Sequence, residues 1–278
     1  MFRSIGNEVW AFDCEWAPDP HAGRRLYHLA DSVSDEAVIR EMWKNGGATE
    51  LDPQPYLKTV MCRLLSIVAV VRSARDDDVV LSLHTLPQDV SDPKKTAEEA
   101  ILSTFLSTVG KRRPQIVGFN SVEADLRIIV QRGVVHGLCA KDFSSRPNKP
   151  WEGEDYFSRH SEGHLDLRGL LCGFGKSGHS LHEIAVLSGI PGKMDVSGSA
   201  VVSLWLEGRW DEIVHYNQFD ALTTYLLWLR VALFAGHFSV EQHRVEEERV
   251  EALLQRSISE GMTHLQKYSD EWQRLRKA

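Results

Sequence analysis

Two acidic residues, Asp13 and Glu15, lie inside the otherwise apolar run of residues 9–16. In a strand successive side chains alternate between two faces, so both carboxylates point the same way, with their Cα atoms roughly 7 Å apart. Paired carboxylates can bind Mg²⁺ or Mn²⁺, which prefer oxygen ligands. A half-exposed strand end with two solvated acids has the same pattern. Further acids downstream decide between these two interpretations.

Acids in two later contexts favour the metal site. Asp125 falls in the first turn of a predicted helix after the predicted strand 115–120, where the helix dipole favours an acid in any case. Tyr216 and Asp220 are four residues apart near the start of the longest predicted helix and share one of its faces. His215, five residues before Asp220, is the alternative to Tyr216 as its partner. On a continuous helix Tyr216 is about 40° around the axis from Asp220 and His215 about 140°, which favours Tyr216.

Strand and helix patterns alternate along the chain, which predicts an α/β layered domain with helices on both faces of a sheet. Residues 17–60 are predicted to form an insertion with a helix of its own. The predicted strands are 9–16, 62–71, 79–86, 115–120 and 164–167, and the predicted helices are 34–43, 98–109, 122–135, 180–188, 199–206 and 211–234.

The tail, residues 239–278, is highly charged and carries apolar residues at helical spacing, which predicts one long amphipathic helix. This helix folds back on the domain, or it binds a protein partner or a second copy of the chain. The chain is therefore divided into a domain 1–238 and a C-terminal extension 239–278. The apolar series consists of Val250, Leu254, Ile258, Met262, Leu265, Tyr268, Trp272 and Leu275.

In this order and spacing the acids resemble the motifs of the DEDD superfamily of 3′-to-5′ exonucleases, in its DEDDy branch. Residues 181–185, 189–193 and 206–209 are similar to the predicted exonuclease family related to the proofreading domain of family B DNA polymerases. The likeness covers residues 9–232 and leaves out the insertion and the tail. It implies a ribonuclease H-like mixed five-stranded sheet flanked by helices, with an added C-terminal helix. The three motifs are Asp13 and Glu15, then Asn120 and Asp125, then Tyr216 and Asp220.

The resemblance also implies a mechanism. Asp13, Glu15, Asp125 and Asp220 would bind two Mg²⁺ or Mn²⁺ ions, and Tyr216 would orient the attacking water. The backbone at Cys14 and the side chain of Asn120 are candidate contacts to the terminal nucleotide. Asp166 is expected to be a structural acid that supports the site. Arg127 and Arg132 are either phosphate contacts or solvated surface charges.

Single-stranded DNA with a free 3′ end is the implied substrate and 5′-mononucleotides are the products. A 3′-end-trimming exoribonuclease would have the same acids, because nothing in them distinguishes a 2′-hydroxyl from hydrogen. A module that binds nucleic acid without catalysis is the alternative of another class. The presence of all four acids argues against that alternative.

The net charge of −7 and the pI near 5.9 disfavour a protein that binds long duplex DNA mainly by counterion release. They are compatible with a site whose positive charge comes from bound cations. The four cysteines have no C-x-x-C spacing, which argues against a zinc knuckle and a disulfide framework. No apolar run reaches the ~18 residues of a membrane span and no signal peptide is evident, so a cytoplasmic protein without membrane contact is expected.

Overall fold

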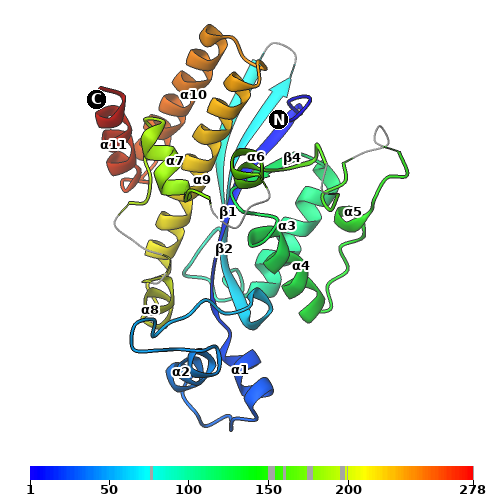
Figure 1. Cartoon of the computed structure of the whole chain (residues 1–278), viewed down its shortest axis with the longest axis vertical. Coiled ribbons are helices and arrows are strands. Elements are labelled where there is room, and N and C mark those ends of the chain that lie inside the picture. The colour runs from blue at the N-terminus through cyan, green and yellow to red at the C-terminus, as the bar shows by residue number, and fades with distance from the viewer. Residues whose placement is uncertain are drawn as a thin grey trace.

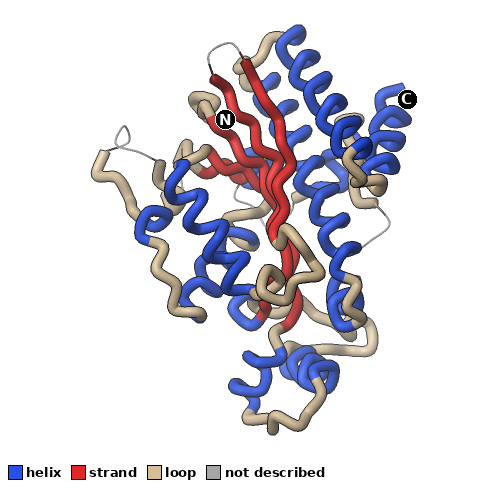
Figure 2. The backbone as a smooth tube through the Cα atoms, turned by 180° about the vertical axis from the view of Figure 1, so that it is seen from behind, coloured by secondary structure: helices blue, strands red, loops and turns tan. Residues whose placement is uncertain are grey.

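The computed structural model describes residues 1–75, 78–149, 154–158, 161–173, 178–194, 198 and 200–277. Its centre is a five-stranded sheet in the order β3-β2-β1-β4-β5. The pairs β3/β2 and β2/β1 are antiparallel, and the pairs β1/β4 and β4/β5 are parallel. This mixed sheet confirms the predicted ribonuclease H-like fold class, with β1 in the middle (Figure 2). The strands are β1 (Glu8–Pro18), β2 (Cys62–Arg75), β3 (Asp78–Leu86), β4 (Gln115–Gly118) and β5 (His164–Asp166).

Helices cover both faces of the sheet (Figure 1). Val9 and Ala11 of β1 pack into the cluster that contains the long helix α9, whereas Trp10 and Phe12 pack into the cluster on the other face. Because this alternation continues along β1, Asp13 and Glu15 lie on the α9 face. The first face carries α6 (Leu167–Cys172), α7 (Leu181–Leu187), α9 (Trp210–Phe234), α10 (Val240–Ser259) and α11 (Leu265–Lys277), and the second carries α3 (Glu98–Arg112), α4 (Asp125–Val135) and α5 (Lys141–Ser144).

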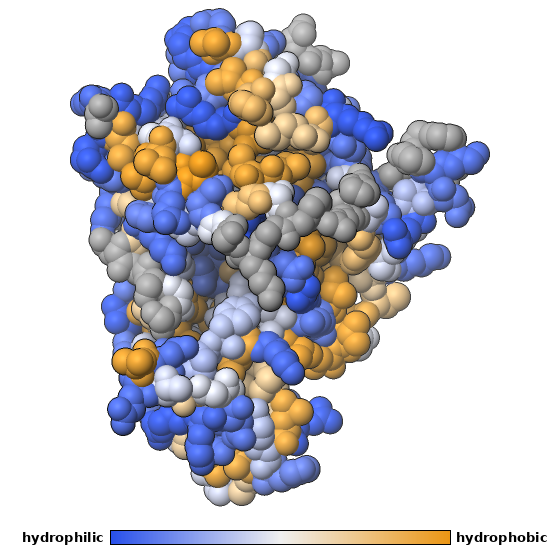
Figure 3. Space-filling view, in the orientation of Figure 1, coloured by the Kyte–Doolittle hydropathy of each residue, from blue (hydrophilic) through white to orange (hydrophobic). Residues whose placement is uncertain are grey.

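No helix in the described part of the chain is long and apolar enough to cross a membrane. Apolar side chains do reach the surface over α6 and α7 (Figure 3). Leu187, the last residue of α7, is 85% exposed.

The insertion forms a small layer at one end of the sheet, made of α1 (Pro20–Tyr27) and α2 (Asp35–Asn45) (Figure 1). The chain then returns to the sheet through the short 3-10 helix η1 (Thr59–Met61), which contacts α4 and β2. The structure contains α2 where the sequence predicts a helix, with Ser34 as its N-cap. Residues 17–20 were expected only to end the first strand, and helix α1 was not predicted. Asp19 caps it by accepting a hydrogen bond from the N–H of His21, and Pro20 stands at a first-turn position that tolerates proline. Helix α8 (Ala200–Leu206) packs in the same layer, and Ser199, where it was predicted to begin, lies outside the described residues.

A buried ion cluster fastens the insertion to the sheet domain. Arg132 of α4 contacts Asp19 at 2.7 Å and Glu98 of α3 at 2.6 Å, and its side chain is only 4% exposed. Neither interpretation of Arg132 from the sequence is therefore correct, because it is neither a solvated charge nor available to phosphate. Arg127 lies on the surface and pairs with Glu123.

The tail folds as two helices, so the prediction of one long helix is wrong. Helix α10 ends at Ser259, and Gly261 follows with φ of 109°, a conformation that a helix cannot contain and that glycine adopts readily. Helix α11 then returns against the domain, and Tyr268 and Trp272 are fully buried in the same cluster as β1 and α9. The domain itself thus covers the apolar stripe of the tail. The alternative, in which the tail binds a protein partner or a second copy of the chain, is not supported.

A buried ion pair joins the tail to the sheet. Glu246 of α10 accepts hydrogen bonds from Nε and Nη2 of Arg72 of β2 at 3.2 and 2.7 Å, and both side chains are almost fully buried. We expect Glu246→Ala to destabilise the protein by about 3 to 5 kcal/mol, because Arg72 would be left buried without its main partner. Urea unfolding measures this. Glu248→Ala, which removes an exposed partner of Arg244, is the control and should change stability by about 1 kcal/mol or less. Equal effects of the two substitutions would contradict this account of the tail.

Candidate active site

One edge of β1 is unpaired where the acids lie. β4 pairs with β1 only at residues 9–11, so in the described structure β1 has no neighbouring strand on that side from Phe12 onward. On its other side β1 remains paired with β2, and the register shifts between Glu15 and Trp16. Such irregularities re-aim side chains and are common beside active sites. Around Asp13 and Glu15, β1 is therefore hydrogen-bonded to β2 on one side and has no strand partner on the other.

Asp125 occupies part of this unpaired edge. The chain leaves β4 at Gly118, turns at Asn120 with φ of 61°, and starts α4 at Asp125. Oδ1 of Asp125 accepts a hydrogen bond from the backbone N–H of Cys14 at 3.0 Å. A neighbouring strand would normally provide such an acceptor. Asp125 thus replaces a strand partner and is fixed to β1 next to the other acids.

Asp166, at the end of β5, supports this turn. Its carboxylate accepts hydrogen bonds from the N–H groups of Asn120 at 2.9 Å and Val122 at 3.0 Å. It also caps α6 by accepting from the N–H of Arg168, whose guanidinium donates to Oδ1 of Asn120 at 3.0 Å. Asp166 is therefore a structural acid that orients the turn before Asp125.

Helix α9 supplies the remaining acid across the face of the sheet. Asp13, Glu15 and Asp220 each place one carboxylate oxygen within 4.8 Å of the others. Asn217 donates from Nδ2 to Oδ2 of Asp13 at 3.2 Å and orients that carboxylate. Asp125 is not in this group of three, but its charge raises the pKa of Asp13. The structure thus gathers three of the four predicted metal ligands and places the fourth beside them.

The acids of the site are hard to ionise in the absence of cations. Burial raises the pKa values of Asp13 and Glu15 well above their ordinary range, and the neighbouring carboxylates raise them further. Burial also raises the pKa of Asp220 to about 6 and that of Asp125 to about 7. Three clustered carboxylates form an all-oxygen donor set suited to a hard divalent cation, whose charge would offset their repulsion.

Tyr216 and His215 face different surroundings. Burial raises the pKa of Tyr216 far above its ordinary value, and the nearby charges of Asp220 and Glu15 raise it further, so its hydroxyl stays protonated. The ring of His215 instead stacks on His264 of the tail, with centroids 3.6 Å apart. The geometry therefore joins Tyr216 to the acids, as the helical spacing suggested.

The two predicted contacts to the terminal nucleotide are held by other residues. The N–H of Cys14 is donated to Asp125, and its side chain is buried in the cluster on the opposite face of the sheet. Asn120 is half-buried and its side-chain oxygen accepts from Arg168. The role of both residues as substrate contacts stays a prediction.

Two residues near the acids were not predicted as site residues. Burial raises the pKa values of Glu15 and Asp220, and the positive charge of Lys193, an exposed residue in the loop after α7, partly offsets this rise. Asn217 lies on α9 one residue after Tyr216 and is fully buried. The sequence offered a signal for Asn217, because an amide side chain within a largely apolar helix needs a hydrogen-bond partner. Lys193 gave no comparable signal, because its position depends on a loop that the sequence pattern does not place.

Comparison with known proteins adds three findings. Residues 54–272 match a family described as a predicted 3′-5′ exonuclease related to the exonuclease domain of PolB. The matched range begins after Asp13 and Glu15 and includes most of the tail, which lies outside the resemblance found in residues 9–232. The structure is similar to that of the family B DNA polymerase from the hyperthermophilic archaeon Pyrobaculum calidifontis, with a TM-score of 0.44 and 15% identity over 91% of this chain and 29% of the polymerase chain. The chain thus spans less than a third of that polymerase, and no curated protein matches it.

The crowding of acids predicts that divalent cations stabilise the fold. Because the folded protein holds Asp220 and Asp125 at pKa values of about 6 and 7 against an ordinary 3.8, it binds protons that the unfolded chain has lost. In EDTA, stability should therefore fall as pH rises from about 4 to about 7. At pH 7.5, Mn²⁺ should raise the unfolding temperature by binding the folded state alone. Differential scanning fluorimetry across this pH range measures both effects.

Asp13→Asn is the matched variant for this experiment. Removing one of the clustered charges should raise the unfolding temperature in EDTA and reduce the stabilisation by Mn²⁺. Asp31→Asn, at an exposed position of the insertion, should change neither quantity. An equal response to Mn²⁺ in both variants would show that the acids do not bind the cation.

Proposed function

Because the chain belongs to the family of predicted 3′-5′ exonucleases related to the exonuclease domain of PolB, we propose that it removes nucleotides from the 3′ ends of single-stranded DNA. The terminal phosphodiester is hydrolysed and a 5′-mononucleotide is released. The observation that carries this proposal is the convergence of Asp13, Glu15 and Asp220 on the α9 face of β1. Asp125 beside them completes the set of four acids.

The four acids would hold two divalent cations, Mg²⁺ or Mn²⁺. When bound, such cations polarise a phosphodiester, lower the pKa of water and stabilise the leaving oxygen. The donor set fits hard cations because it consists of carboxylates, without a cysteine or histidine. The burial of these like charges also favours a functional over a stabilising role, because without a cation it weakens the fold.

Tyr216 is proposed to orient the attacking water. Its hydroxyl stays protonated near Asp220, so it would position a water molecule through a hydrogen bond and would not act as a base. Lys193 is proposed to face the phosphate, since it is exposed and its positive charge acts on Glu15 and Asp220.

A terminal phosphodiester reaches these acids only if its strand end is separated from a complementary strand. The cluster is largely buried, with Glu15 and Asp220 only 8% and 9% exposed, so a stacked duplex end cannot approach it closely. The net charge of −7 further disfavours tight binding of duplex DNA. Both features support single strands as the substrate.

Hydrolysis is tested with 5′-labelled single-stranded DNA and RNA of one sequence in Mn²⁺, Mg²⁺ or EDTA. We expect a ladder that shortens from the 3′ end of DNA, that disappears in EDTA, and that Asp13→Ala reduces by at least about 10³-fold, because one of the clustered ligands is lost. Asp31→Asn serves as the control and should act like the wild-type protein. Preferential trimming of RNA would assign the protein to exoribonucleases. If the protein binds DNA or RNA but releases no product, the exonuclease proposal is wrong and the protein is a nucleic-acid-binding module without catalysis.

A second prediction separates Tyr216 from His215. Tyr216→Phe should lower kcat by about 10- to 100-fold, because the water loses an orienting hydrogen bond at the acids. Steady-state kinetics on an oligonucleotide in Mn²⁺ measure this. His215→Phe should lower kcat less than Tyr216→Phe does. The reverse order would assign the orienting role to His215.

A further inference from the structure

A hollow of about 230 Å³ opens beside Tyr216, between α9 and the tail. Its walls come from three segments that are distant in the sequence: one face of α9, the loop after α7, and the turn between α10 and α11. Flat rings form much of the lining. The lining includes Met194, His215, Tyr216, Phe219, Thr263 and His264.

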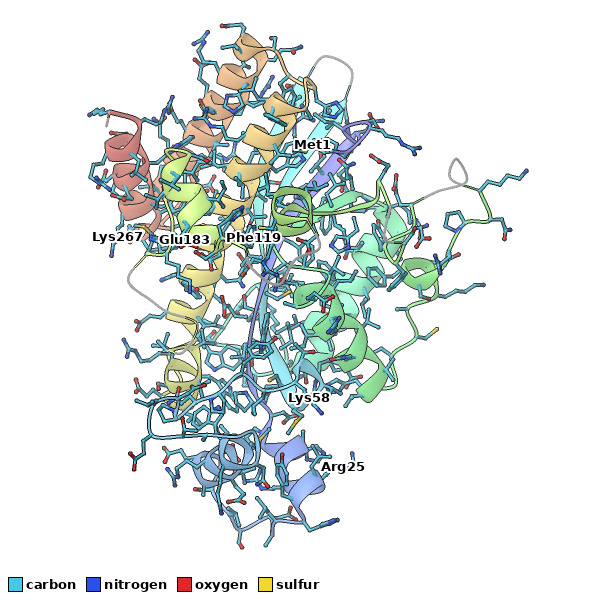
Figure 4. All side chains as sticks on the ribbon, in the orientation of Figure 1. Met1, Arg25, Lys58, Phe119, Glu183 and Lys267 are labelled. Carbon is cyan, nitrogen blue, oxygen red and sulfur yellow. The ribbon has the colours of Figure 1, made fainter. Side chains whose placement is uncertain are left out.

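Specific contacts fix these walls relative to one another. The hydroxyl of Thr223 on α9 donates to the carbonyl of Pro191 at 2.9 Å and lies 3.0 Å from the hydroxyl of Tyr268 on α11. Phe219 stacks on Tyr268 with ring centroids 5.7 Å apart and an interplanar angle of 14°. Figure 4 shows α11, with Lys267, beside α7, with Glu183. The hollow is therefore built into the packing of the tail.

The stacked rings of His215 and His264 form one side of this hollow. Their centroids are 3.6 Å apart and their planes differ by 14°. Nε2 of His264 is hydrogen-bonded to Oε1 of Gln218, which fixes the orientation of the ring. Burial lowers the pKa of His264 to about 4, so at neutral pH this ring stacks as an uncharged plane. A second flat ring could extend the stack.

The hollow and the acids are adjacent. Tyr216 lines the hollow, and the charges of Asp220, Glu15 and Asp13 act on its hydroxyl. Met194 lines it on the other side and directly follows Lys193, whose charge acts on Glu15 and Asp220. A strand end whose last phosphodiester lies at the acids can therefore reach the hollow with its terminal base.

We propose that this hollow binds the base of the 3′-terminal nucleotide, so that the turn before α11 provides part of the substrate site. The proposal rests on the exonuclease function proposed above. Stacking on neutral rings is available to every base, so the site should accept all four bases and reject an end that lacks one.

The test compares two 5′-labelled oligonucleotides that differ only in the terminal residue, which carries a normal base or is abasic. Binding is measured by fluorescence anisotropy in Ca²⁺ and KM by hydrolysis in Mn²⁺. For the wild-type protein we expect the abasic end to bind about 5- to 150-fold more weakly. His264→Ala should weaken binding of the base-bearing end about 5-fold or more and leave the abasic end unchanged. His264→Phe, which keeps a flat ring, should retain the preference.

Gln273→Ala, on an exposed position of α11, is the control variant and should behave like the wild-type protein. Equal affinity of the wild-type protein for both ends, or an unchanged preference in a folded His264→Ala variant, would overturn the base site while hydrolysis in Mn²⁺ still supports the exonuclease. A base preference that His264→Ala removes, without hydrolysis by the wild-type protein, would support the site and overturn the exonuclease. Failure to bind either oligonucleotide would overturn both.

Discussion

The main constraint on this structure is that three carboxylates of like charge lie close together and largely out of contact with water. Asp13 and Glu15 stand on β1, the central strand, and Asp220 faces them from α9. Their repulsion and desolvation oppose folding, as the raised pKa values show. The apolar clusters on both faces of the sheet must offset this penalty. The fold therefore holds an arrangement that is unfavourable by itself and becomes favourable when cations are bound.

The geometry of β1 explains why the site forms where it does. Parallel pairing with β4 ends at Ala11, which frees the edge of β1 for the N–H of Cys14 to be bound by Asp125. Asp166 fixes the intervening turn through two backbone N–H groups. The turn after β4 thus brings Asp125 to β1, Asp166 at the end of β5 holds that turn, and α9 covers the same point from one face.

The α/β class and the pairs of residues that share one face could be predicted because both depend on local periodicity, whereas the ribonuclease H-like sheet and the grouping of the three motifs into one site came from the resemblance. A period of two places Asp13 and Glu15 on one face, and a spacing of four does the same for Tyr216 and Asp220. Features that depend on tertiary contacts were missed or misread. Arg132 looks like a surface charge until Asp19 and Glu98 are brought to it from the insertion and α3. The position of Lys193 depends on a loop, and the break at Gly261 is hidden by an apolar stripe that continues through it.

The position of the tail links its stability to the proposed chemistry. Residues of α10 and α11 share one cluster with β1 and α9, so residues 239–277 contribute to the core of the predicted domain 1–238. The same packing places His264 against His215, one residue before Tyr216. A displacement of α11 would therefore disturb the core and the hollow beside the acids together. The family match runs to residue 272 and so includes α10 and part of α11, as expected for helices that belong to the same core as β1 and α9.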